Sequence, residues 1–456
     1  MSYSFPKTFQ WGTATAAYQI EGAATVGGRL PSVWDTFSAT PGRVLNGDTG
    51  AVACDHYYRY EDDIRLMADL GVKHYRFSLA WPRIVPEGRG TVNQAGLDFY
   101  QSLVDRLLAH GITPHATLFH WDSPQALEER YGSWRSREMA QDFADYVTVV
   151  VRALGDRIHH WMTINEIFCF THMGYGINTT PPHAPGTTVQ SLKAVWQTSH
   201  HALLAHGLGC QAIRATSPQP CSVALVDNFL ATVPISETPE NIAAAQAAFH
   251  TVGTNGGIIF PALTGKYSPA LLELLGDQAP DIEPGDLETI HQPLDAFGLN
   301  IYTGLYVRAA DTDTGYAVLP FPQGYPRMHM PWLQVVPESL YWGVRHVSET
   351  LQRPELPILI SENGCAAQDQ VTDWGEVLDL DRIQYLRQYL QAAHRAVSEG
   401  YPLQGYFLWS FMDNFEWAFG YDRRFGITYI DYATQQRIPK ASFQWYKQCI
   451  ATNQVM

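Results

Sequence analysis

Two glutamates stand directly after apolar stretches that are typical of buried strands. Glu166 follows residues 159–164 and Asn165, and Glu362 follows residues 357–361. Two carboxyl groups on either side of one bond can supply the acid and the nucleophile, or the acid and the base, of glycoside hydrolysis. An isolated glutamate is usually a solvated surface charge, but a carboxyl at the end of a buried strand is predicted to face a pocket.

The spacing of these two carboxyl groups decides the stereochemistry of such a reaction. A retaining enzyme holds them roughly 5–5.5 Å apart and an inverting enzyme roughly 6.5–9.5 Å apart. The sequence gives no such distance, so both mechanisms stay open at the level of these residues.

Helical patterns alternate with short apolar strands along the chain. The helical patterns cover residues 61–70, 97–110, 139–154 and 381–399. Glycine directly follows each of these patterns, as expected at the end of a helix. Strands are predicted at residues 9–14, 72–79, 113–119, 159–164, 222–228, 296–300, 357–361 and 405–410.

This alternation indicates parallel βα units. We expect residues 1–456 to form a single (β/α)₈ TIM barrel, with the excess length in long loops at the C-terminal face of the strands. The stretch 306–332, rich in proline and glycine, is one such predicted loop. An open doubly wound sheet is the alternative, but no Gly-x-Gly-x-x-Gly motif follows a strand.

Polar or aromatic side chains follow nearly every predicted strand. Along the chain they are Gln19 and Glu21, Trp81 and Arg83, His120 to Asp122, Asn165 and Glu166, Asp227 and Asn228, Asn300 and Tyr302, Glu362 and Asn363, and Trp409 and Ser410. Turns are polar in any protein, but repetition at the same end of successive strands favours an active site. On a closed barrel the fourth and seventh strands, which carry the two glutamates, face each other across the mouth.

Composition narrows the function classes. The formal net charge of −15 argues against nucleic-acid binding. No apolar run is long enough to cross a membrane, and no secretion signal is apparent. The 6 cysteines form no Cys-x-x-Cys pair, which fits a reduced, cytoplasmic protein. Adjacent histidines occur at residues 159–160 and 200–201, but they lack the spacing of metal ligands, so we expect no metal site. We also expect no cofactor.

Several motifs, in the right order and over nearly the whole chain, resemble glycoside hydrolase family 1, the β-glucosidase family. They lie at residues 9–22, 75–78 with 81–84, 165–166, 183–186, 360–364 and 409–417. The resemblance implies that Glu362 is the nucleophile and Glu166 the general acid/base. It also implies that Arg76 keeps Glu362 ionised, that Asn165 binds the sugar 2-hydroxyl, and that Tyr302 donates a hydrogen bond to Glu362.

The resemblance assigns the remaining site residues to substrate binding. Hydroxyl contacts are expected from Gln19, His120, Trp121, Glu416 and Trp417, with Asn300 close to the nucleophile. Trp409 is expected to form the stacking floor and Phe425 to close one side. Phe168 and Trp332 match positions on the leaving-group side.

The implied activity is that of a retaining β-glucosidase. Its expected substrates are terminal non-reducing β-D-glucosyl residues, with galactosyl and fucosyl residues as further glycones, in cellobiose, short oligosaccharides and aryl or alkyl glycosides. A 6-phospho-β-glycosidase is the runner-up, and Glu416 would repel its phosphate. A non-catalytic carbohydrate-binding relative would lack one of the glutamates. Transglycosylation and a homo-oligomer both stay open.

The chain departs from the family pattern beside the acid/base residue. Ile167 stands where the family usually has proline. Because proline restricts both itself and the residue before it, we hypothesise that packing holds Glu166 instead. Ser361 replaces the usual threonine, Ile301 replaces a frequent tyrosine, and Cys169 lies near the predicted pocket mouth.

Overall fold

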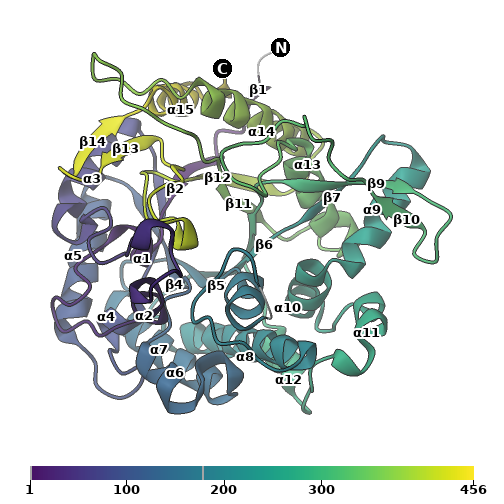
Figure 1. Ribbon diagram of the computed structural model, residues 1–456, viewed down its shortest axis with the longest axis horizontal. Coiled ribbons are helices and arrows are strands. Elements are labelled where there is room, and N and C mark those ends of the chain that lie inside the picture. The colour runs from purple at the N-terminus through teal and green to yellow at the C-terminus, as the bar shows by residue number, and fades with distance from the viewer. Residues whose placement is uncertain (1–2, 177–178) are drawn as a thin grey trace.

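The computed structural model describes residues 3–176 and 179–456. Its centre is a closed barrel of parallel strands in the order β2-β3-β4-β5-β6-β8-β11-β12 (Figure 1). The barrel strands are β2 (Gln10–Ala14), β3 (His74–Ser78), β4 (Thr113–Phe119), β5 (His160–Asn165), β6 (Ser222–Asn228), β8 (Ala296–Asn300), β11 (Ile358–Asn363) and β12 (Leu403–Trp409). The predicted TIM barrel is confirmed, with each predicted strand within a few residues of its observed position.

Helices surround the barrel (Figure 1). Those predicted from the sequence are α3 (His56–Leu70), α5 (Gln94–Ala109), α7 (Glu138–Leu154) and α14 (Leu380–Ser398). Gly71 ends α3 with a φ of 89°, the left-handed conformation that glycine adopts without strain. The other long helices are α8 (Leu192–Thr216), α9 (Pro239–Thr251), α13 (Glu338–Arg345) and α15 (Ala441–Thr452).

Shorter helices occupy the connections. They are α1 (Ala17–Ile20), α2 (Val33–Ala39), α4 (Trp81–Ile84), α6 (Gln125–Tyr131), α10 (Phe260–Thr264), α11 (Pro269–Leu275) and α12 (Asp286–Ile290). Among the described residues, no helix combines the length and the apolar character that a membrane span requires.

The stretch 306–332 is only partly the loop that the sequence suggested. It contains most of β9 (Gly304–Ala309) and all of β10 (Tyr316–Val318), which pair with each other. On its other edge β9 pairs with β7 (Ala231–Pro234), so the three strands form a small sheet outside the barrel, at the right of Figure 1. One of the two partners of β9, the strand β7, lies far away in the sequence, so local composition could not reveal this sheet.

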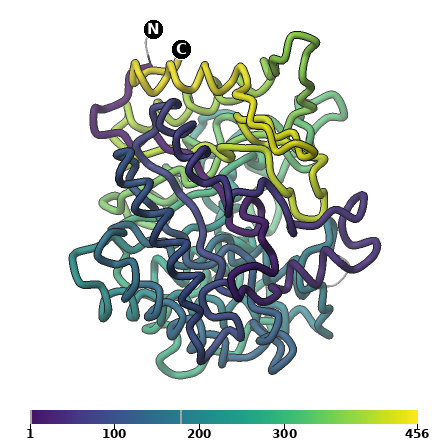
Figure 2. The backbone as a smooth tube through the Cα atoms, turned by 90° about the vertical axis from the view of Figure 1, so that its left-hand side faces the viewer, coloured from purple at the N-terminus to yellow at the C-terminus, as the bar shows by residue number. Residues whose placement is uncertain are grey.

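Two further strand pairs complete the fold. Strands β13 (Thr428–Asp431) and β14 (Gln436–Pro439) form a hairpin. Strands β1 (Tyr3–Ser4) and β15 (Gln454–Val455) pair, so the two ends of the described chain lie side by side (Figure 2).

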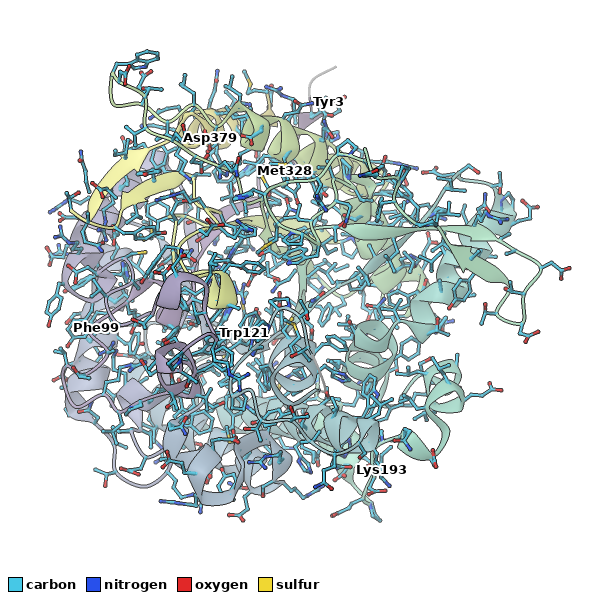
Figure 3. All side chains as sticks on the ribbon, viewed as in Figure 1. Tyr3, Phe99, Trp121, Lys193, Met328 and Asp379 are labelled. Atoms are coloured by element: carbon cyan, nitrogen blue, oxygen red, sulfur yellow. The ribbon has the colours of Figure 1, made fainter. Side chains whose placement is uncertain are left out.

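Side chains fill the ring that the ribbon outlines (Figure 3). Trp121 lies beside the central opening, whereas Tyr3 and Lys193 lie at the periphery. Every residue of β11 is buried, as expected for a parallel strand covered on both faces. Three barrel strands carry buried polar residues near the mouth of the barrel: Arg76, Asn165 and Asn300. Buried polar groups at this end of the barrel indicate a binding site.

Candidate active site

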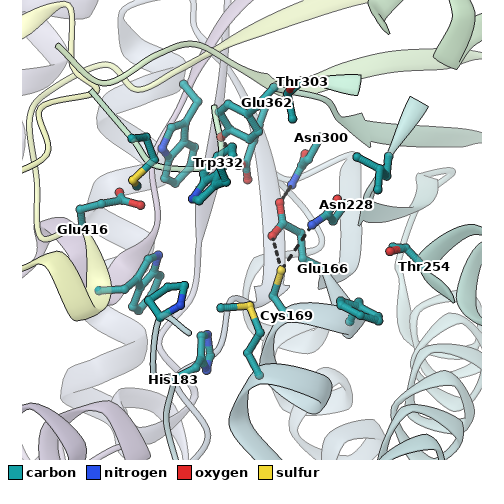
Figure 4. Close-up of a pocket in the computed structure, with 18 of the residues that line it drawn as sticks. Glu166, Cys169, His183, Asn228, Thr254, Asn300, Thr303, Trp332, Glu362 and Glu416 are labelled. Atoms are coloured by element: carbon teal, nitrogen blue, oxygen red, sulfur yellow. Dashed lines mark hydrogen bonds between the residues drawn. The ribbon is translucent and has the colours of Figure 1, made fainter. Parts of the chain in front are cut away.

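A cavity opens at the C-terminal ends of the barrel strands (Figure 4). The predicted site residues that line it are His120, Trp121, Glu166, Phe168, Asn300, Tyr302, Trp332, Glu362, Trp409, Glu416, Trp417 and Phe425. The other three, Gln19, Arg76 and Asn165, are buried and bond to the lining residues. The sequence-based selection therefore converges on one place in the molecule.

Glu362 is held by two donors at the end of β11. Its Oε1 accepts a hydrogen bond from Arg76 Nη1 at 2.5 Å, and its Oε2 accepts one from the Tyr302 hydroxyl at 2.7 Å. Burial raises the pKa of Glu362, while Arg76 and the Tyr302 hydroxyl oppose that shift. A guanidinium and a hydroxyl both favour the carboxylate, so Glu362 is the member of the pair that ionises first.

Glu166 lies one residue beyond β5 in different surroundings. Its Oε1 accepts a hydrogen bond from Asn300 Nδ2 at 2.7 Å, and its Oε2 accepts one from the Cys169 thiol at 3.1 Å (Figure 4). Burial, reinforced by the charge of Glu362, raises the pKa of Glu166 to about 7. Such a carboxyl is protonated in slightly acidic solution and can donate its proton.

Asn165 joins the two glutamates through shared partners. Its Oδ1 accepts hydrogen bonds from Arg76 Nη2 at 2.6 Å and from Asn300 Nδ2 at 3.0 Å. Its Nδ2 lies 3.2 Å from His120 Nε2. An amide nitrogen carries two hydrogens, so one remains for a ligand in the cavity.

One end of the cavity offers unpaired polar atoms. Gln19 Nε2 donates to Asn414 Oδ1 and the Phe415 carbonyl, but its Oε1 is buried without a partner among the described residues. His120 Nδ1 is also buried and unpaired there. Buried polar atoms are normally hydrogen-bonded, so these two atoms can form hydrogen bonds with hydroxyl groups of a ligand.

Glu416 lies at the same end. Burial, with the charges of Glu362 and Glu166, raises the pKa of Glu416 to about 8. A neutral Glu416 weakens the repulsion of phosphate that the sequence suggested. Among the described lining residues, however, there is no lysine or arginine that would balance a phosphate group.

Aromatic rings form the walls. Trp409 lies nearly parallel to the ring of His120, with ring centres 5.8 Å apart. Tyr302 meets the rings of Trp332 and Phe425 edge to face at 5.8 Å and 6.0 Å. Flat apolar walls suit the apolar faces of a pyranose ring.

Trp121 differs from its expected role in one respect. Its indole N–H donates to the backbone carbonyl of Asn165 at 3.0 Å, so this N–H is occupied in the protein.

Trp121, Glu166 and Trp417 all have positive φ values, of 78°, 51° and 51°. Such strain gathers at functional sites, where the surrounding structure fixes it.

The structure adds contacts that the sequence did not reveal. The thiol of Cys169 bonds to Glu166, and Asn228 Nδ2 donates to Cys169 Sγ at 3.5 Å. Ser361 keeps the hydroxyl of the usual threonine and donates to Asn300 Oδ1 at 2.7 Å. The sequence offered signals for these residues but not for their contacts: Asn228 ends the fifth barrel strand, Cys169 lies near the predicted pocket mouth, and Ser361 replaces the usual threonine.

The whole chain matches a known family. The model for glycosyl hydrolase family 1 covers residues 1–455. The chain belongs to this family. A family 1 relative, the bifunctional β-D-glucosidase/β-D-fucosidase of Bifidobacterium breve, is 43% identical over 99% of both chains. β-Glucosidase A of Thermotoga maritima is 43% identical over 98% of both chains.

Solved family 1 structures agree with the fold. A family 1 β-glucosidase from Thermotoga maritima superposes with a TM-score of 0.90 at 41% identity, covering 100% of this chain and 99% of that one. A β-glucosidase of the same organism in complex with glucoimidazole gives a TM-score of 0.89 at 42% identity, with 99% of each chain covered. The predicted family membership is thus confirmed by sequence and by structure.

Proposed function

We propose that this family 1 enzyme is a retaining β-glucosidase. It removes terminal non-reducing β-D-glucosyl residues by double displacement, with Glu362 as nucleophile and Glu166 as acid/base. The observation that carries the proposal is the contrast between the two carboxyl groups. Glu362 is paired with a guanidinium and a hydroxyl, whereas burial raises the pKa of Glu166 to about 7.

In the first step Glu362 attacks the anomeric carbon while Glu166 protonates the departing oxygen. The Asn300 amide bonds to Glu166 and also lowers the pKa of Glu362, so it lies near both carboxyl groups. One small amide close to both groups supports the shorter, retaining separation.

In the second step Glu166 takes a proton from water, which attacks the glycosyl-enzyme. Burial still raises the pKa of Glu166 in the intermediate, but the ester removes the charge of Glu362 and with it the repulsion that raised this pKa further. The pKa of Glu166 then falls, so the same group changes from acid to base. Asn165 binds the sugar 2-hydroxyl in this proposal, a contact that strengthens in the transition state; the amide hydrogen that Asn165 does not share with His120 supports this role.

Glucose is the proposed main glycone, with galactose and fucose as further glycones. The unpaired Gln19 Oε1 and Glu416 supply hydroxyl contacts, and the names of the relatives include a β-glucosidase and a glucosidase/fucosidase. Cellobiose, short oligosaccharides and aryl or alkyl glucosides fit a cavity with aromatic walls. A 6-phosphorylated glycone is disfavoured because the described residues that line the cavity include no lysine or arginine to pair with a phosphate group.

The proposed setting is the cytoplasm, with small imported glycosides as substrates. All 6 cysteines are free thiols, and five of them are buried. Free thiols suit a reducing compartment.

The anomer released first tests the function. An aryl β-glucoside is hydrolysed in an NMR tube, and the anomeric proton of glucose is followed before mutarotation. We expect β-glucose to appear first. Release of α-glucose would contradict double displacement, and no turnover of glucosides, galactosides or fucosides would contradict the proposed activity.

A further inference from the structure

The acid/base glutamate is followed by a backbone N–H that a proline would not have. Ile167 N donates to Asp227 Oδ2 at 3.3 Å, and the side chains of both residues are fully buried. Proline at this position could not make the bond, because it has no backbone N–H. The replacement of proline by Ile167 therefore comes with a specific acceptor on the neighbouring strand.

We propose that Asp227 is a positioning residue for the acid/base Glu166, acting through the backbone of Ile167. The inference rests on the proposed role of Glu166. Asp227 itself lies outside the set of groups that line the cavity and acts on the reaction only through the turn that carries Glu166.

Two consecutive residues of β6 hold two consecutive residues of this turn. Glu166 N donates to the carbonyl oxygen of Val226 at 3.0 Å, and Ile167 N donates to the side chain of Asp227. Glu166 has a φ of 51°, a left-handed conformation that is strained for a glutamate. Strained backbone persists only where its surroundings fix it, and the pair of N–H bonds does so here.

A carboxyl group is a suitable acceptor only if it adds no second charge beside Glu166. Burial raises the pKa of Asp227 well above its usual range, and the neighbouring Glu166 raises it further. Asp227 Oδ1 is buried without a partner among the described residues. Asp227 Oδ2 accepts the Ile167 N–H, and the raised pKa of Asp227 favours its neutral form, which adds no charge beside Glu166.

The test compares two glucosides that differ in how much they need an acid. Cellobiose has a poor leaving group that must be protonated, whereas a 2,4-dinitrophenyl glucoside leaves without help. We expect Asp227→Ala to lower kcat/KM about tenfold for cellobiose and hardly at all for the dinitrophenyl glucoside, since a small misplacement is costly only where the acid acts.

Three matched variants sharpen the result. Asp227→Asn keeps a neutral acceptor and should retain most of the wild-type cellobiose activity. Ile167→Pro also removes the donor, but it restores the family's proline, which restricts the turn by itself, so it should change kcat only mildly. In the Ile167→Pro background the donor is already absent, so adding Asp227→Ala should cause little further loss of cellobiose activity.

Several outcomes would overturn the proposal. Equal losses on both substrates in Asp227→Ala would mean a merely structural role, and a loss in Asp227→Asn as large as in Asp227→Ala would exclude the neutral acceptor. Because Asp227→Asn is nearly isosteric, it remains informative if the alanine variant fails to fold. If Glu166→Ala shows no leaving-group dependence, the role of Glu166 fails as well; dependence there but not in Asp227→Ala removes only the present inference.

Discussion

Two glutamates at one barrel mouth lie in contrasting surroundings. Glu362 is part of β11, where it pairs with Asn300 of β8, and its side-chain partners are Arg76 and the Tyr302 hydroxyl. Glu166 lies beyond the last residue of β5, in a strained turn, and its partners are an amide and a thiol. The surroundings of the two identical side chains thus favour different protonation states, ionised for Glu362 and protonated for Glu166.

The difference matches what each group must do. A nucleophile has to be ionised and rigidly aimed, which a strand and a guanidinium supply. An acid/base group has to hold a proton in one step and release it in the next, which requires a pKa near the working pH. The most direct way to break the contrast is to remove the charge of one member.

Glu362→Gln should have the largest effect. Without a nucleophile we expect kcat for an aryl β-glucoside to fall by about 10⁴-fold or more, because residues that act as a unit lose most of the catalysis when one is removed. Steady-state kinetics measures this loss. Glu129→Gln, at an exposed helical position, is the control and should keep wild-type activity. Comparable loss in both variants would point to a preparation artefact instead.

Glu166→Ala should come next and should depend on the leaving group. For cellobiose we expect kcat/KM to fall by about 10³-fold, whereas a dinitrophenyl glucoside should keep most of its kcat/KM. Azide should restore turnover of the activated glucoside, because an anionic nucleophile needs no base to attack the glycosyl-enzyme. Loss without leaving-group dependence would argue that Glu166 is not the acid.

Tyr302→Phe should weaken the nucleophile more modestly. Its hydroxyl donates to the ionised form of Glu362, so its removal raises the pKa of that carboxyl. Activity requires ionised Glu362 and is lost as the pH falls, so the acidic limb of the kcat/KM profile should move to higher pH. We expect kcat to fall about tenfold. An acidic limb that stays in place would separate Tyr302 from the ionisation of Glu362.

Cys169→Ala should have the smallest effect, and it should act on the other limb. The thiol bond favours ionised Glu166, so its loss raises the pKa of Glu166 above about 7. Activity requires protonated Glu166 and is lost as the pH rises, so the basic limb should move to higher pH. We expect kcat/KM to change only about twofold.

Two control variants accompany Cys169→Ala. Cys169→Ser keeps a donor at the site, and Cys221→Ala alters a cysteine outside the cavity lining. Both should leave the basic limb near its wild-type position. A shift of the acidic limb in Cys169→Ala would mean that the thiol acts on Glu362 instead of Glu166.

The barrel and most of its site residues could be predicted because they depend on local pattern. Apolar strands ending in polar residues marked Glu166, Asn300 and Glu362 directly. The bond from Ile167 to Asp227 could not, since it requires β6 to lie beside the turn after β5. The thiol contact of Cys169 with Glu166 spans only three residues, but it depends on the turn in which Glu166 has a positive φ, and local pattern does not reveal that turn. The sequence predicts that packing replaces proline after Glu166; Ile167 is fully buried in the structure, and its backbone N–H adds a hydrogen bond.

The central claim is that Glu362 becomes covalently attached to the sugar while Glu166 handles the proton. A 2-deoxy-2-fluoro-β-glucoside with a good leaving group slows hydrolysis of the intermediate, so intact-protein mass spectrometry can detect it after brief incubation. We predict a gain of one fluoroglucosyl unit, mapped by proteolysis to the peptide that carries Glu362 and absent in Glu362→Gln. An adduct on another residue, or none while ordinary aryl glucosides are still hydrolysed, would contradict this account.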